Sequence, residues 1–164
     1  MTEPPAEILR RLRPIPTTVG PPTTVPRDVV GVAPDGRAVR IDVVGATAPV
    51  LLLFLSADCI GCEVLWAGLS ELRTGLGRAA RLAVVTKAPP AEDPATIAGL
   101  AADEKGHPGA PVVMSGTAFT DYRAAAPFLA LATPAAVLTE GVAWGVDDTL
   151  RSARAALAGP SSDG

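Results

Sequence analysis

Two cysteines, Cys59 and Cys62, are the residues of this sequence best suited to chemistry. Two residues separate them, so their sulfurs can close a small disulfide ring and open it again. A cysteine at the start of a helix is favoured as the thiolate, which is the form that attacks disulfides. We therefore expect Cys59 to begin a helix with a partly exposed sulfur, and Cys62 to be shielded and to resolve the mixed disulfide.

Two other interpretations of the pair stay open at this point. The cysteines could be inert core residues, or they could supply half of a zinc site. Zinc takes about four ligands, and the other soft candidate is the lone His107, far away in an expected loop between Gly106 and Pro108. His107 is most simply a solvent-facing residue, and we expect no metal.

The segments on either side of the cysteines favour the redox interpretation. Val50–Leu55 is apolar at every position, the pattern of a central strand covered on both faces. After the cysteines, leucines recur at helical spacing, at positions Leu65, Leu69, Leu72 and Leu76. A strand, a short loop with both cysteines and an amphipathic helix make half of a βαβ unit.

The rest of the chain alternates between strand and helix patterns. Asp35-Gly36 predicts the turn of a hairpin. Further expected strands are Val29–Val32, Ala38–Val43, Leu82–Thr86, Pro111–Ser115, Phe128–Ala132 and Ala135–Thr139. Further expected helices are Pro94–Glu104, Ala118–Arg123 and Asp147–Ala158. These patterns predict an α/β chain that ends in an antiparallel hairpin and a helix.

Length and composition exclude several classes of protein. The 164 residues correspond to one domain, and 14 basic residues against 17 acidic ones argue against nucleic acid as a partner. No apolar run is long enough to span a membrane, and the first residues lack the pattern of an export signal. We expect a cytoplasmic protein as the chain is written, or an extracytoplasmic tethered domain if a membrane anchor precedes Met1.

The chain divides into three parts by composition. Residues 1–28 are rich in proline and threonine and predict an extended arm or linker. Residues 29–159 carry the strand and helix patterns of the domain, and residues 160–164 form a polar tail that we expect to be flexible.

The ordered set of motifs resembles the TlpA-type thiol-disulfide oxidoreductases, and within them the thioredoxin-domain proteins akin to the methylamine-utilisation accessory protein MauD. The residues that carry the resemblance are Leu53–Cys62, Trp66, Val84–Lys87, Val112–Ser115, Asp121-Tyr122 and Glu140-Gly141. The resemblance covers residues 29–158. It implies a thioredoxin-like three-layer α/β/α sandwich with a central mixed sheet and an N-terminal β-hairpin.

The resemblance also implies a function. Such a protein reduces or isomerises disulfides in a partner protein through its CxxC dithiol, is recharged by a second redox protein, and needs no organic cofactor. The alternative is a redox-silent interaction module that keeps the fold and binds a partner beside the CxxC.

Thioredoxin-like folds place a cis-proline against the CxxC, where the preceding residue pairs with a substrate strand. Two pairs compete for this substrate-binding role, Ala126-Pro127 and Thr133-Pro134. We favour Pro127, because the residues from Phe128 onward are then numerous enough to form both strands of a hairpin. Pro134 would lie in the turn of that hairpin.

The sequence departs from the thioredoxin pattern beside the cysteines. The usual tryptophan before the first cysteine is Asp58, and the central strand carries no acid. Asp58 and Glu63 place two carboxylates near the dithiol, which disfavours a thiolate and predicts a reducing dithiol. Trp66 is expected in the core, while Trp144 is compatible with core or partner contact.

Overall fold

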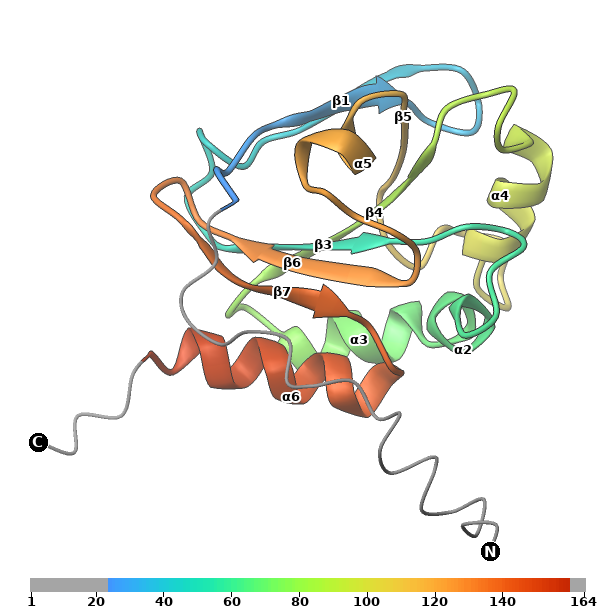
Figure 1. Cartoon of the computed structure of the whole chain (residues 1–164). Coiled ribbons are helices and arrows are strands. Elements are labelled where there is room, and N and C mark those ends of the chain that lie inside the picture. The colour runs from blue at the N-terminus through green and yellow to red at the C-terminus, as the bar shows by residue number, and fades with distance from the viewer. Residues whose placement is uncertain (1–23, 160–164) are drawn as a thin grey trace, which may run out of the picture.

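A seven-stranded mixed sheet lies at the centre of the structure, a computed structural model that describes residues 24–159 (Figure 1). The strands are β1 (Val29–Val32), β2 (Ala38–Ile41), β3 (Val50–Phe54), β4 (Arg81–Lys87), β5 (Val112–Ser115), β6 (Phe128–Ala132) and β7 (Val137–Val142). They lie in the order β2-β1-β5-β4-β3-β6-β7. β3, β4 and β5 are parallel neighbours, and every other pair is antiparallel.

The predicted central strand is confirmed as β3. All five of its side chains are buried. Alternate side chains of a strand point to opposite faces, so β3 supplies Leu51 and Leu53 to one core cluster and Leu52 and Phe54 to the other. Both faces of the sheet must therefore be covered.

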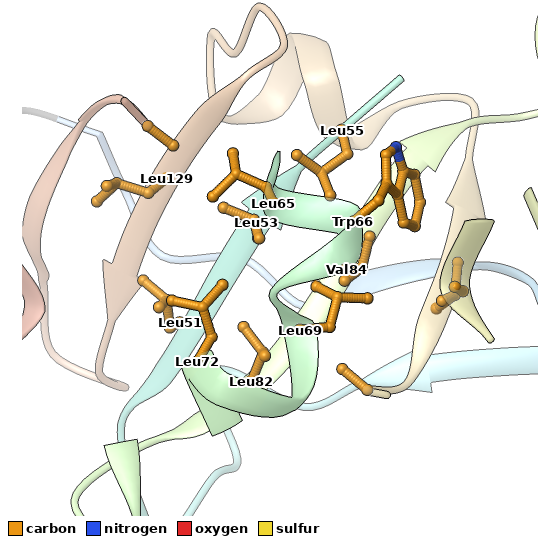
Figure 2. Packing of buried hydrophobic residues seen from close by; sticks show 14 of the residues in the cluster. Leu51, Leu53, Leu55, Leu65, Trp66, Leu69, Leu72, Leu82, Val84 and Leu129 are labelled. Atoms are coloured by element: carbon orange, nitrogen blue, oxygen red, sulfur yellow. The ribbon is translucent and has the colours of Figure 1, made fainter. Parts of the chain in front are cut away.

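Helices cover the two faces unequally. The helices are α2 (Cys62–Ala67), α3 (Leu69–Leu76), α4 (Pro94–Ala101), α5 (Ala118–Asp121) and α6 (Val146–Leu157). The larger cluster receives buried side chains from α2, α3, α4 and α6, and Figure 2 shows the leucines of α2 and α3 packed onto β3. The short α5 lies on the opposite face of the sheet (Figure 1), where Tyr122 and side chains of the β1–β2 hairpin, itself part of the sheet, complete the smaller cluster. The chain has the predicted three layers around a mixed sheet.

The helix after the cysteines differs from the prediction, because it is broken at Gly68. A Cβ atom on Gly68 would lie 2.3 Å from Cγ2 of Val146 in α6 and 3.0 Å from the carbonyl oxygen of Val64. Only a glycine lets the first turn of α6 approach the chain this closely. The predicted leucine face is nevertheless buried along both pieces.

Several predicted boundaries were also wrong: β2 ends at Ile41 rather than Val43, and α5 ends at Asp121 rather than Arg123. α4 ends at Ala101 rather than Glu104, because Asp103 closes a turn in which its carboxylate accepts from the amides of Lys105 and His107. β7 spans Val137–Val142 rather than Ala135–Thr139. Thr133 bonds to Ala136 through both main chain and side chain, so the hairpin turn takes up two more residues than expected.

Residues 1–23 of the predicted arm and the predicted tail at 160–164 lie outside the described residues. Residues 24–28 contact the domain: the hydroxyl of the buried Tyr122 donates to the carbonyl of Arg27 and accepts from its amide. Within residues 24–159, no helix is long and apolar enough to cross a membrane.

Asp28 links this N-terminal segment to the end of the first hairpin. Its carboxylate accepts hydrogen bonds from the amides of Val43 at 2.8 Å and Val44 at 2.9 Å, and it pairs with Arg40. The hydrogen bonds from the two main-chain amides, and then the Arg40 guanidinium, hold the pKa of Asp28 below its usual value. The charged form of Asp28 therefore stabilises the fold.

We expect Asp28→Asn to lower the free energy of unfolding by about 1 kcal/mol at pH 7, the difference between a charged and a neutral acceptor. Because the pKa of Asp28 is lower in the folded state than the value of about 3.9 in the unfolded state, its charge stabilises the fold at pH values above that unfolded-state pKa. This stabilisation is lost as the pH falls through the folded-state pKa. Urea unfolding of both proteins should thus give a gap at pH 7 that closes below about pH 4. A gap that is the same at both pH values would contradict the role assigned to the charge.

Candidate active site

Cys59 and Cys62 are joined by a disulfide, with their Cα atoms 5.2 Å apart. Both follow the carboxyl end of β3, the edge of a parallel sheet where sites in α/β proteins gather. Cys59 is half-buried, whereas Cys62 is 1% exposed and belongs to the larger core cluster. The predicted difference in exposure between the two cysteines is confirmed, and Cys59 is the more exposed of the pair.

The predicted position of Cys59 at the helix start was wrong. α2 begins at Cys62, and Cys59 lies before it in a turn. This turn is closed by a hydrogen bond of 3.2 Å from the amide of Cys62 to the carbonyl of Cys59. Gly61 has a φ of 95°, so the left-handed conformation interrupts the helix between the two cysteines. The dipole of the six-residue α2 therefore acts on Cys59 from one turn away, and its effect falls off over that distance.

Pro127 lies against this turn. The Ala126–Pro127 bond is cis, as expected, and a Cβ atom on Gly61 would lie 3.6 Å from Cγ of Pro127. The carbonyl of Pro127 accepts from the amide of Ala143 at 3.1 Å, which holds it at the start of β6. Ala126 lines the same cavity as Cys59.

The alternative pair Thr133-Pro134 is not at the site. The antiparallel register of β3 and β6 pairs Phe54 with Phe128 and Val50 with Ala132. The cysteines follow Phe54, so Thr133-Pro134, which follows Ala132, lies at the opposite end of the two strands. The Thr133–Pro134 bond is not among the cis bonds of the described residues.

A cavity of about 420 Å³ opens beside Cys59 at the carboxyl ends of β3 and β4. Its charged lining consists of Asp58, Lys87 and Glu92, and Phe119 and Ala124 to Ala126 complete one wall. Asp58 and Lys87 are exposed, whereas Glu92 is 7% exposed. The cavity places a buried carboxylate near the Cys59–Cys62 disulfide.

Glu92 is a site residue that the sequence analysis missed. One carboxylate oxygen accepts from the Ser56 hydroxyl at 2.8 Å, and the other accepts from the Ala57 amide at 3.4 Å. The signal was the position of Glu92 in the loop just after β4, because the carboxyl ends of parallel neighbours meet at one edge of a sheet. The predicted lack of an acid on β3 itself is correct.

The two tryptophans and the histidine occupy different surroundings. Trp66 is in the core as expected (Figure 2), and its indole Nε1 donates to the carbonyl of Ser56 at 3.0 Å. Trp144 is 58% exposed. His107 is exposed in the loop closed by Asp103, as expected. Across residues 24–159, no group of three or more His, Cys, Asp or Glu side chains could hold a metal ion.

Comparison with known proteins finds similarity at the level of structure. No protein-family model and no curated protein matches the sequence. StoA from Bacillus subtilis superposes with a TM-score of 0.61 at 13% identity, over 80% of this chain and 98% of that one. A thioredoxin-family thiol:disulfide interchange protein from Chlorobium tepidum gives 0.61 at 14% identity, over 85% and 99%. A secreted Mycobacterium tuberculosis disulfide oxidoreductase homologous to DsbE of E. coli gives 0.58 at 12% identity, over 77% and 94%.

These structures share the mixed sheet and the helices of this chain, and the chain has the thioredoxin-like fold. The resemblance predicted from the sequence is therefore confirmed for the fold. Its finer assignment, to proteins akin to MauD, stays a prediction.

Gly61 provides a test of the turn that carries the cysteines. We expect Gly61→Ala to lower the free energy of unfolding of the oxidised protein by about 1–2 kcal/mol, because a Cβ disfavours the left-handed conformation. The Pro127 contact at 3.6 Å is ordinary, so the cost is conformational. The control is Gly99→Ala in α4, where no atom lies within 4 Å of the added Cβ and alanine should stabilise by up to about 1 kcal/mol. Equal effects of the two substitutions in thermal unfolding would contradict this account.

Proposed function

We propose that this protein is a thiol-disulfide oxidoreductase that reduces or isomerises disulfides in a partner protein. The observation that carries the proposal is the Cys59–Cys62 pair at the carboxyl edge of the sheet, with one sulfur accessible and one buried. The thioredoxin-like fold supports it, since the similar structures named above include a thiol:disulfide interchange protein and a disulfide oxidoreductase.

The proposed reaction transfers two electrons. The Cys59 thiolate attacks one sulfur of the partner disulfide, and the other partner sulfur leaves as a thiolate that takes up a proton. Cys62 then loses its proton and attacks the Cys59 sulfur of the mixed disulfide, which releases the second partner sulfur as a thiol. The partner disulfide is reduced, the Cys59–Cys62 disulfide is formed, and a donor of two electrons restores the dithiol.

The partner chain would bind along Ala126 and Pro127. Among the described residues, the main-chain amide and carbonyl of Ala126 make no backbone hydrogen bond, so both are free to pair with an extended segment. Ile60, inside the CxxC, is 99% exposed, and Val64 is 55% exposed on α2. These apolar side chains would contact the partner around its cysteine. The chemistry is the same in the cytoplasm and outside it, since it requires only a partner disulfide and an electron donor.

Single cysteine variants test the proposed division of labour. Cys62→Ser leaves the attacking thiol and removes the resolving one, so the reduced variant should accumulate a mixed disulfide with a disulfide-bonded test protein. Cys59→Ser should form none, because its remaining thiol is buried. The adducts are resolved on non-reducing gels and mapped by mass spectrometry.

A redox-silent module would give another result. Neither variant would trap the test protein, and a partner would bind with equal affinity to both variants and to the native chain. Trapping through Cys62 rather than Cys59 would reverse the proposed roles.

The charge around the dithiol predicts its reduction potential. Asp58 is exposed beside Cys59, Glu63 is in the first turn of α2, and α2 begins only after Cys59. A weakly stabilised thiolate gives a potential nearer the value of about −270 mV for thioredoxin than about −120 mV for a strong oxidant. Equilibration with thiol redox buffers measures it. Joint replacement Asp58→Asn and Glu63→Gln should raise the potential, and a native value near −120 mV would contradict the prediction.

A further inference from the structure

We propose that Glu92 is a positioning residue for the dithiol: it fixes the segment that leads to Cys59 and sets the reactivity of the Cys59 thiol through its charge. This inference rests on the proposed function. Glu92 is a buried acid outside the CxxC, and it comes from the loop between β4 and α4 rather than from β3, the strand that leads to the cysteines.

The first part of the inference concerns geometry. Ser56 and Ala57 connect β3 to the cysteine turn, and Glu92 accepts from the hydroxyl of the first and the amide of the second. Trp66 of α2 donates to the Ser56 carbonyl. The segment is thus held by α2 on one side and by the β4–α4 loop on the other, so the position of Cys59 depends on both.

The second part concerns charge. Glu92 and Cys59 line the same cavity, and Glu92 is 7% exposed, so solvent screens its charge less than that of the exposed Asp58. The charged side chains that line this cavity are Asp58, Lys87 and Glu92, and Glu63 lies in the first turn of α2; Asp121 and Arg123 lie near the wall formed by Phe119 and Ala124, outside the lining. Lys87 is the cation of this lining, and it is exposed, with its ammonium 5.7 Å from the centre of the Phe119 ring. A fixed negative charge nearby disfavours the thiolate of Cys59 in the reduced protein.

Three variants separate the effect of the Glu92 charge from the effect of its hydrogen bonds to Ser56 and Ala57. Glu92→Gln removes the charge and keeps the shape of the side chain. Ser56→Ala removes one anchoring hydrogen bond and keeps the charge. Asp58→Asn is the matched control, because it removes an exposed carboxylate from the wall of the same cavity.

The experiment measures alkylation of the reduced proteins by iodoacetamide as a function of pH, with the modified cysteine identified by mass spectrometry, and the dithiol–disulfide equilibrium with glutathione. For Glu92→Gln we expect the midpoint of Cys59 alkylation to move about 0.5 pH unit or more towards acid, and the equilibrium to move about threefold or more towards the dithiol. Asp58→Asn should move both by less. Ser56→Ala should lower the unfolding temperature and leave the alkylation midpoint near the native value.

An unchanged midpoint in folded Glu92→Gln would overturn the inference, as would an equal shift in Ser56→Ala. If Glu92→Gln does not fold, the variants Glu92→Asp and Glu92→Asn take its place, because their side chains are equal in size and differ in charge. Equal alkylation midpoints in these two variants would overturn the inference. The proposed function fails separately: a native protein that exchanges no disulfide refutes the function, whereas a native protein that exchanges disulfides with all midpoints equal refutes only the role of Glu92.

Discussion

The arrangement of the molecule depends on the burial of β3 on both faces. Its five residues are all apolar and all buried, so the chain must place a layer on each side of the strand. α2, α3, α4 and α6 form one layer, and the short α5 with Tyr122 forms the thinner other one. A strand buried in this way has a fixed end, and the cysteine turn is attached to that end. The rigid core thus determines where Cys59 can lie.

Three separate segments meet at this end of the sheet. The turn after β3 carries the cysteines, the loop after β4 carries Glu92, and the segment before β6 carries Ala126 and Pro127. The parallel pairing of β3 with β4 and the antiparallel pairing of β3 with β6 bring them together. The site is therefore a property of strand order, and the thioredoxin-like sheet supplies that order. The same core holds Cys62 beneath the surface and leaves Cys59 at it.

Features with a local cause could be predicted from the sequence. The uninterrupted apolar run predicted β3, the spacing of the cysteines predicted the disulfide pair, and the length needed for a hairpin selected Pro127 over Pro134. Features that depend on contacts between distant segments could not. The need for glycine at position 68 comes from the approach of Val146. The proposed role of Glu92 comes from its hydrogen bonds to Ser56 and Ala57, 36 and 35 residues away. A single sequence carries little trace of such contacts.

The most direct measurement is a single turnover of the reduced protein with a peptide that contains one disulfide, followed by mass spectrometry of both reactants. We expect each peptide disulfide lost to be matched by one Cys59–Cys62 disulfide gained, with the protein folded throughout. The peptide is chosen so that the reduction potential of its disulfide lies well above that of thioredoxin. If the protein stays folded with its dithiol reduced and the peptide disulfide persists, the proposed function is contradicted.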